Sequence, residues 1–232
     1  MTPFNPNNSP PTVEHLSVQL SSPDRKTRIL AMLELQKEEV SAQKAYPLLR
    51  QALQDEAEQV RGMAAFALGI KPVPQSLAQL VHTLASDSDY NVRAMAAGAL
   101  GYLGDRQALA SLSRAFWEDT SWLVQFSAAV ALGNLKDPQA IALLLEALDS
   151  EQTLLQEAAI MALGEIGATE QVERLLNFVT AKDWLIRKRV AEALGNMPVP
   201  QSLSALQYLS RDPNTHVAAA AQSALAQLAE LL

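Results

Sequence analysis

The sequence contains no cysteine among its 232 residues. This absence excludes disulfide bonds, thiolate catalysis and zinc sites built on sulfur, and it fits a reducing, cytosolic compartment. Histidine is scarce too, and His15, His82 and His216 lie far apart in the sequence. Because no two of them are one helical turn apart, we expect no metal site.

The chain also has no surplus of basic charge and no long apolar run. It carries 18 Lys and Arg against 25 Asp and Glu, a formal net charge of −7. The basic residues are dispersed, so we do not expect a nucleic-acid partner. No stretch reaches the roughly 18 apolar residues of a membrane span, and residues 1–11 do not look like a signal peptide. We therefore expect a soluble, cytoplasmic protein that is not inserted in a membrane.

What the chain does contain is a repeat. The tripeptide Ala-Leu-Gly recurs at steps of 32, 32, 31, 31 and 31 residues, with one diverged copy at the end. The copies are Ala67–Gly69, Ala99–Gly101, Ala131–Gly133, Ala162–Gly164, Ala193–Gly195 and Ala224–Ala226. A period of this length is typical of helical hairpins that stack to bury their apolar faces. The sequence predicts an all-α fold, an α-solenoid forming a right-handed superhelix of about seven hairpins.

The repeat also predicts the domain organisation. Four prolines and three asparagines among the first 11 residues predict a flexible tail over 1–11, followed by one repeat domain over 12–232. The expected hairpins span residues 12–38, 42–71, 75–103, 107–135, 138–167, 169–198 and 201–231. Gly104 and Gly167 are expected to end helices, and Asp55, Asp87, Asp119 and Asp212 are expected to satisfy N–H groups where second helices start.

Two columns of residues recur at fixed places in the hairpins. The first contains Arg28, Arg61 and Arg93, seven residues before the repeated leucine. These guanidinium groups form either a structural ladder with the interhelix aspartates or a contact for an anionic ligand. The second column contains the rim aromatics Tyr90, Trp122 and Trp184. Each ring is either part of a binding surface or a lid on its own hairpin.

A third set lies on the expected concave face of the second helices. Its apolar members are Phe66, Ile70, Tyr102, Phe126, Val130 and Met161, and Glu157 and Lys188 make one end polar. Such a strip suits a partner helix or an open-chain tetrapyrrole, unless the curvature of the stack buries it between repeats. Glu157, Glu165 and Glu192 could act in acid–base catalysis, but solvated carboxylates are far commoner, and no catalytic residue is assigned.

The order of an Asp, then Val-Arg, then Ala-Leu-Gly resembles the HEAT-like repeats of the phycobilisome-lyase family. The segment from Trp117 to Pro138 is similar to the phycobilisome-degradation proteins of the non-bleaching B type, found in cyanobacteria. This resemblance implies binding to phycocyanin or allophycocyanin subunits during antenna turnover, at phycobilisomes on the thylakoid surface. We expect no resident cofactor, while transient binding of phycocyanobilin and formation of a homo-oligomer stay open.

Three functions follow from these observations. The first is a non-catalytic scaffold that recognises phycobiliprotein subunits through the concave face. The second is an enzyme, a bilin lyase or chromophore-detachment factor, in which aromatic rings stack on the tetrapyrrole and Arg61 or Arg93 pairs with its propionates. The third is a general protein-interaction adaptor, because a repeat fold does not determine function.

Overall fold

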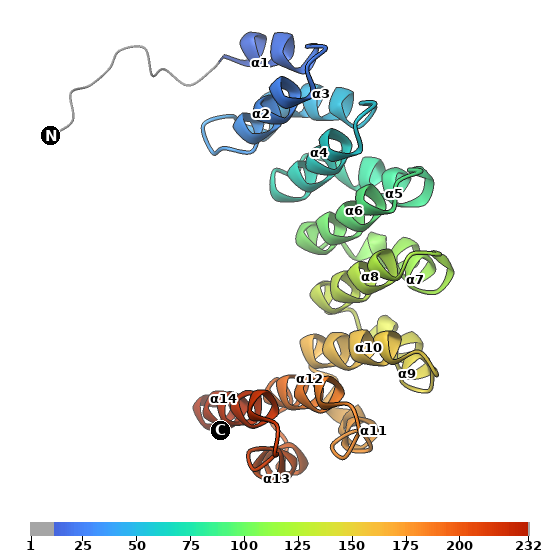
Figure 1. Ribbon diagram of the computed structural model, residues 1–232, viewed down its shortest axis with the longest axis vertical. Helices are drawn as coiled ribbons and strands as arrows, with labels where there is room; N and C mark the ends of the chain where they lie inside the picture. Colours follow the sequence, from blue (N-terminus) through green and yellow to red (C-terminus); the bar gives the residue numbers. More distant parts are fainter. Residues whose placement is uncertain (1–11, 232) are drawn as a thin grey trace, which may run out of the picture. The chain divides into compact units, whose positions relative to one another are not determined.

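The computed structural model describes residues 12–231, and the predicted tail over 1–11 lies outside the described residues. Within residues 12–231 the chain forms fourteen α-helices and three short 3-10 helices, with no β-strand. The helices alternate as first and second members of hairpins (Figure 1). This confirms the predicted all-α, α-solenoid class, and the hairpins begin and end within a few residues of the predicted boundaries.

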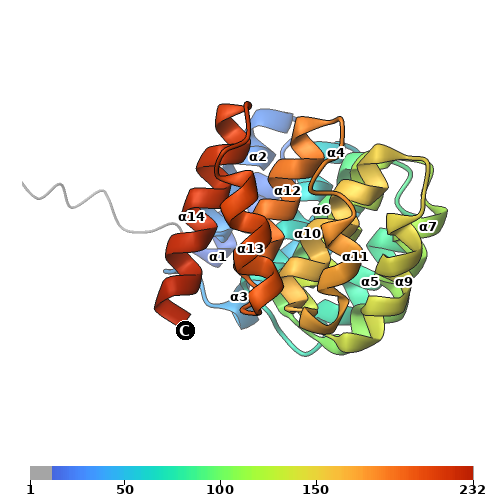
Figure 2. The same cartoon turned by 90° about the horizontal axis from the view of Figure 1, so that it is seen from below.

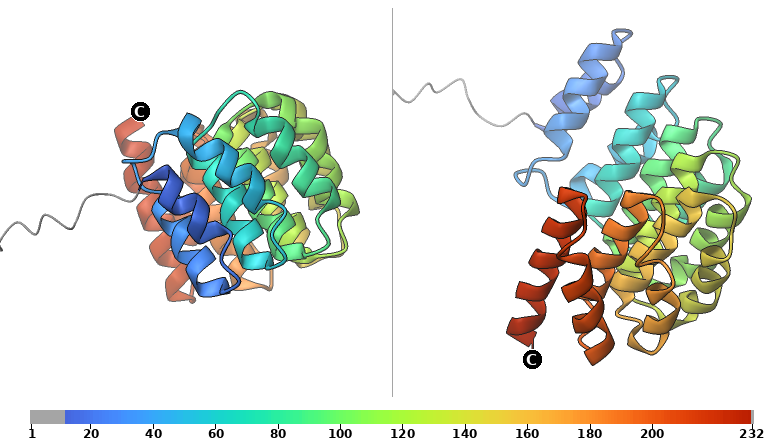
Figure 3. Two further views of the ribbon diagram at one scale, coloured as in Figure 1. Left: turned by 90° about the horizontal axis from the view of Figure 1, so that it is seen from above. Right: turned by 60° about the horizontal axis from the view of Figure 1, so that its bottom comes forward.

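The chain divides into two compact units, of which unit 1 ends at Leu103 and unit 2 begins at Gly104. Unit 1 contains three hairpins, in which the second helices pack side by side in chain order, α2 against α4 and α4 against α6 (Figures 1 and 3). The hairpins are α1 (Val13–Leu20) with α2 (Arg25–Leu35), α3 (Ala42–Ala52) with α4 (Glu58–Ile70), and α5 (Ser76–Ser86) with α6 (Tyr90–Leu103).

Unit 2 contains four hairpins, and its second helices α8, α10, α12 and α14 also pack in chain order, the last of them visible from below in Figure 2. The 3-10 helices η1 (Arg106–Ala108), η2 (Pro138–Ala140) and η3 (Thr169–Gln171) lead into three of its first helices. The hairpins are α7 (Leu109–Glu118) with α8 (Trp122–Leu135), α9 (Ile141–Leu148) with α10 (Thr153–Ile166), α11 (Val172–Leu176) with α12 (Trp184–Gly195), and α13 (Pro200–Leu209) with α14 (Thr215–Leu231).

The repeated tripeptide explains how the second helices pack. Its leucines, from Leu68 to Leu194, are fully buried. Its glycine allows two helices to approach closely: a Cβ on Gly69 would lie 2.8 Å from the Cα of Ala99, the alanine of the next copy. On Gly164 it would lie 2.6 Å from the Cα of Ala193. Alanine at either position would overlap the backbone of the next helix, so the motif encodes the contact between successive second helices.

The loops between helices follow the sequence pattern with one correction. The four interhelix aspartates accept hydrogen bonds of 2.8 to 2.9 Å, each from the backbone N–H two residues later. That N–H belongs to the residue in front of the second helix, so these side chains form the turn and do not cap the helix itself.

The predicted helix ends at Gly104 and Gly167 are confirmed, since these residues have φ values of 67° and 72°. Lys136 stands at the same repeat position in unit 2 and also has a positive φ, of 48°. A left-handed residue ends a helix by turning its chain away from the helix axis, and glycine adopts that conformation without a Cβ clash.

Candidate functional site

The exposed side of the second helices in unit 1 is apolar. On α4, Met63, Phe66 and Ile70 are three and four residues apart and therefore share one face of the helix. At the equivalent repeat positions Leu30 and Leu33 lie on α2 and Met95 and Tyr102 on α6, while Lys37 and Gly98 occupy the remaining two; α2 and α6 both pack against α4. We call this set the unit-1 apolar face; it comprises Leu30, Leu33, Met63, Phe66, Ile70, Met95 and Tyr102.

This face is open to solvent. Five of its side chains are exposed, from 39% for Met95 to 66% for Tyr102, and Met63 and Phe66 are half-buried. Phe66 on α4 packs edge-to-face against Tyr102 on α6, with ring centroids 5.9 Å apart and an interplanar angle of 85°. Such a pair holds both rings in place. An apolar surface on three adjacent helices is typical of a protein–protein contact site.

A groove opens between the N-terminal halves of α4 and α6. Its volume is about 320 Å³, and it is lined by Glu58, Gln59, Gly62, Met63, Asn91, Val92 and Met95. The two methionines belong to the unit-1 apolar face, so the groove and the face are continuous.

The same repeat positions are mostly polar in unit 2. Arg189 and Glu192 occupy these positions on α12, Asn196 directly follows that helix, and Glu165 occupies the last of the positions on α10. Lys188 and Arg189 both pair with Glu192 on their own helix, at N–O distances of 2.8 and 2.9 Å. The apolar character of the second helices is therefore concentrated in unit 1.

The structure places the predicted face residues in two groups. In unit 1, Ile70 and Tyr102 are exposed and Phe66 is half-buried beside Tyr102. In unit 2, Phe126, Val130, Met161 and Lys188 are half-buried, whereas Glu157 is buried with 8% of its surface exposed.

Sequence reasoning missed four members of the unit-1 apolar face: Leu30, Leu33, Met63 and Met95. Leu30, Met63 and Met95 stand two residues after the arginine column, whereas the sequence interpretation used the positions one, five and nine residues after it. Leu33 stands five residues after Arg28, but the expected face began only at the second hairpin. The position one residue after the arginine points toward the next helix, as a Cβ built on Gly62 shows by approaching Met95 Cγ to 3.6 Å. The spacing of two, five and nine was present in the sequence and could have identified the set.

The rim aromatics stand at the first residue of three second helices and are all exposed. The exposed fractions are 49% for Tyr90, 61% for Trp122 and 41% for Trp184. Trp184 lies against His216 of the following hairpin, with ring centroids 5.4 Å apart. These rings are thus available to a partner at the edges of both units.

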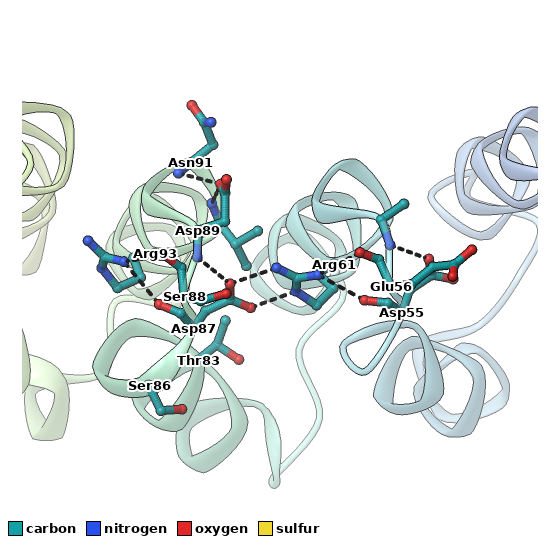
Figure 4. Close-up of polar contacts among 12 residues, drawn as sticks. Asp55, Glu56, Arg61, Thr83, Ser86, Asp87, Ser88, Asp89, Asn91 and Arg93 are labelled. Carbon is teal, nitrogen blue, oxygen red and sulfur yellow. Dashed lines mark hydrogen bonds and ion pairs between the residues drawn. The ribbon is translucent and has the colours of Figure 1, made fainter.

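The arginine column forms a ladder. Arg61 on α4 donates from Nε and Nη2 to the two carboxylate oxygens of Asp87 in the next hairpin, at 2.8 and 2.9 Å (Figure 4). Its Nη1 donates to the carbonyls of Asp55 and Glu56 in its own hairpin. Arg28 reaches Asp55 in the same way, with Nε 2.8 Å from Oδ2, and Arg187 reaches Asp212 at 2.7 and 2.9 Å.

Arg93 follows this pattern within its own hairpin, where its Nη1 donates to the carbonyls of Asp87 and Ser88 (Figure 4). Beside this ladder, a second pocket of about 280 Å³ is lined by Leu53, Gln54, Arg61, His82, Thr83, Ser86, Asp87 and Ser88. Because Arg61 already donates to four protein oxygens, the ladder itself satisfies most of its donors.

The ladder shifts the pKa values of its carboxylates. Burial raises the pKa of Asp87, but the hydrogen bonds from Arg61 and from the N–H of Asp89 outweigh burial, so the pKa lies below its usual range. For Asp212, the hydrogen bonds from Arg187 are the largest cause of a lowered pKa. These carboxylates are ionised at neutral pH and act as fixed partners of the guanidinium groups.

Among residues 12–231, no three His, Asp or Glu side chains are grouped so that they could hold a metal ion. None of the helices in the described part of the chain is long and apolar enough to cross a membrane.

Stacked helical hairpins with close helix contacts and a ladder between successive turns define a helical repeat protein. The family model described as HEAT repeats matches residues 13–90, 77–155 and 142–226. These matches cover most of the sequence, and the chain therefore belongs to the HEAT-repeat family. No curated protein matches it.

Solved structures show the same fold. The complex of CpcE and CpcF of phycocyanin lyase from Nostoc sp. PCC7120 matches with a TM-score of 0.61 and 23% identity, over 98% of this chain and 99% of that one. The Escherichia coli protein YibA matches with a TM-score of 0.58 and 17% identity, over 93% of both chains. A Kap121p variant matches with a TM-score of 0.68 and 15% identity, over 95% of this chain and 29% of its own.

Proposed function

We propose that this protein is a non-catalytic scaffold that binds phycobiliprotein subunits through the unit-1 apolar face during turnover of the light-harvesting antenna. The observation that carries the proposal is the exposure of apolar side chains on α2, α4 and α6, with Tyr102 66% exposed. Soluble chains rarely expose such a surface without a partner.

The class of partner is supported by two resemblances. The segment from Trp117 to Pro138 is similar to phycobilisome-degradation proteins, and the Nostoc structure with the same fold is named as a phycocyanin lyase. We therefore infer phycocyanin or allophycocyanin subunits as partners, and the phycobilisome as the place of action.

A scaffold is favoured over a bilin-binding enzyme by the arginine ladder. Pairing of Arg61 with a propionate would require that its bonds to Asp87 break, since both Nε and Nη2 donate to that carboxylate. Replacing a bidentate carboxylate partner inside the protein with one from a ligand brings little net gain.

The proposal is tested by titrating the protein with phycocyanin and, separately, with free phycocyanobilin, following calorimetry and the visible spectrum together. We expect binding of phycocyanin without a spectral change. Tight binding of free phycocyanobilin with a shifted band would instead indicate lyase-type chemistry. Absence of binding in both titrations would contradict the proposal and favour a general adaptor.

A matched pair of tyrosine variants locates the surface. Tyr102 on α6 and Tyr208 on α13 have similar exposure, 66% and 60%. Tyr102→Asp should weaken phycocyanin binding by about tenfold or more, because a charge replaces the exposed aromatic ring that packs on Phe66. Tyr208→Asp should change binding by less than about twofold. Loss of binding in Phe126→Asp alone would instead place the surface in unit 2.

A further inference from the structure

Two glycines interrupt the second helices of unit 1 without a packing reason. Glycine inside a helix is unfavourable relative to alanine, and Gly69 is justified by the 2.8 Å approach of Ala99. Gly62 in α4 and Gly98 in α6 have no such neighbour. A Cβ on Gly98 would meet no atom within 4 Å, and a Cβ on Gly62 would make an ordinary contact of 3.6 Å with Met95. Alanine would fit at both positions.

Gly62 lies in the wall of the α4–α6 groove described above. The groove, of about 320 Å³, owes part of its space to the missing side chain, and Met63 and Met95 flank it. Met95 is 39% exposed. Methionine side chains are unbranched and adapt their shape to an incoming apolar group. The groove is therefore large enough for one bulky apolar side chain, and its methionine walls can adapt to the shape of that side chain.

The rim of the groove carries one charge. Among its lining residues only Glu58 is ionisable, while Gln59 and Asn91 provide amides. Glu58 accepts a hydrogen bond from the neighbouring Gln59 amide, and the residue as a whole is half-buried. An apolar groove with one acidic edge is complementary to an apolar side chain with a basic residue close by.

We propose that the α4–α6 groove receives one helix of a protein partner, which inserts a leucine-sized or aromatic side chain between Met63 and Met95 and places a lysine or arginine against Glu58. This inference rests on the proposed function, because it specifies how the unit-1 apolar face recognises its protein partner. Helix-in-groove binding uses such an anchor, with apolar residues three or four apart along the partner helix.

The groove can be tested without the natural partner. The probes are two short amphipathic helical peptides, one built of leucine and lysine and one of leucine and glutamate, titrated by fluorescence anisotropy. We expect the lysine peptide to bind at least about tenfold more tightly, because Glu58 attracts only the basic side chain. Equal affinities, or no binding of either peptide, would overturn the inference.

Three variants distinguish peptide binding in the groove from general effects on stability. Gly62→Ala should raise the melting temperature and weaken binding of the lysine peptide at least about threefold, because its methyl group occupies the groove. Gly98→Ala is the matched control: it removes a helix glycine outside the groove, so the melting temperature should rise without a change in affinity. Met95→Lys should abolish binding with the helical content unchanged. Normal binding by Gly62→Ala and Met95→Lys would overturn the inference.

The charge is tested by a second matched pair. Glu58→Gln should reduce the preference for the lysine peptide by about threefold or more, whereas Glu173→Gln, which removes an exposed charge from unit 2, should leave it unchanged. An equal effect of both changes would show only attraction to a net negative protein and would overturn the role of Glu58. If the peptides bind as expected but phycocyanin does not, the inference that the groove binds a helix is supported and the proposed partner is wrong.

Discussion

At the scale of single residues, the glycines of this chain divide by what surrounds them. Gly69 permits a close contact between two helices, since a Cβ would lie 2.8 Å from Ala99, whereas Gly98 has no atom within 4 Å of the same position. One residue type thus has two roles on neighbouring helices of one unit.

This difference predicts opposite effects of one substitution. Gly69→Ala should lower the free energy of unfolding by about 1 to 3 kcal/mol, because the new methyl group overpacks the α4–α6 contact. Gly98→Ala should raise it by about 0.5 to 1 kcal/mol through helix propensity alone. Urea unfolding followed by circular dichroism measures both. Equal effects of the two changes would contradict the packing of α4 on α6.

Glu157 is the other residue whose environment differs from its expected role. It was expected to bind a partner from the polar end of the face, yet only 8% of its surface is exposed. Burial raises its pKa, Asp183 raises it further, and Arg189 opposes the rise. Arg189 instead forms its ion pair with Glu192 on α12.

Removing this buried charge should stabilise the protein in a pH-dependent way. An unfolded glutamate has a pKa of about 4.3, and the pKa of folded Glu157 is higher. The free energy of unfolding therefore falls as the pH rises above about 4.3, because ionisation is harder in the folded protein. Glu157→Gln should therefore raise the melting temperature at neutral pH, and the gain should vanish below about pH 4. Differential scanning calorimetry across pH checks it. A melting temperature below that of the wild type at neutral pH would show that the carboxylate has a stabilising partner.

At the scale of elements, the arginine ladder connects α2, α4 and α12 to the turns of the hairpins that follow them. Where an arginine stands in the column, the next hairpin has an aspartate, as with Arg187 and Asp212. Two turns lack this aspartate and carry Ser150 and Ala181 in its place. The column residues of the hairpins before them are Gln125 and Gln156, respectively. The Gln156 amide still donates to the carbonyls of Leu148 and Ser150, so it keeps the bonds within its own hairpin.

The pairing predicts a position-dependent effect of the same exchange. Arg187→Gln should lower stability by roughly 1 to 3 kcal/mol at neutral pH, because Asp212 loses its charged donors. Arg187 lowers the pKa of Asp212, so this contribution is present above the unfolded pKa of about 3.9 and is lost as the pH falls through the folded value. The difference from wild type should therefore be full at neutral pH and shrink as the pH falls below about 3.9 in urea unfolding curves.

Gln156→Arg is the matched control, since no aspartate stands opposite it. It should give no gain in stability, because the added guanidinium would meet Ala181 in place of a carboxylate. If Gln156→Arg raised the free energy of unfolding by as much as Arg187→Gln lowers it, an arginine in the column would stabilise the protein without a facing aspartate. That result would contradict the pairing of arginine with aspartate.

At the scale of the whole molecule, the fold could be predicted from the sequence, whereas the unit-1 apolar face could be predicted only in part. The period of the Ala-Leu-Gly copies predicts hairpins and their boundaries, because each copy marks the same buried contact. It does not determine how each second helix is rotated against its neighbour. That rotation decides that Met63 and Met95 face solvent while Gly62 points toward the next helix, and it depends on packing between repeats that are distant in sequence.

Charge is also distributed unevenly over the molecule. The sequence up to Leu103 carries nine basic and ten acidic residues, whereas the part from Gly104 onward carries nine basic and fifteen acidic ones. The excess negative charge therefore belongs to unit 2, whereas unit 1, which is nearly neutral, carries the apolar face.

The ladder has a direction, since every paired arginine reaches forward to the hairpin that follows it. Asp55 and Asp87 are 32 residues apart, so excision of one such period would bring Arg28 to Asp87 with the same chemistry at the junction. A lineage could lengthen or shorten unit 1 by whole periods while every guanidinium there keeps a carboxylate. Excision of the hairpin that follows Gln156 would instead bring Gln156 to Asp212, so that carboxylate would lose its guanidinium partner.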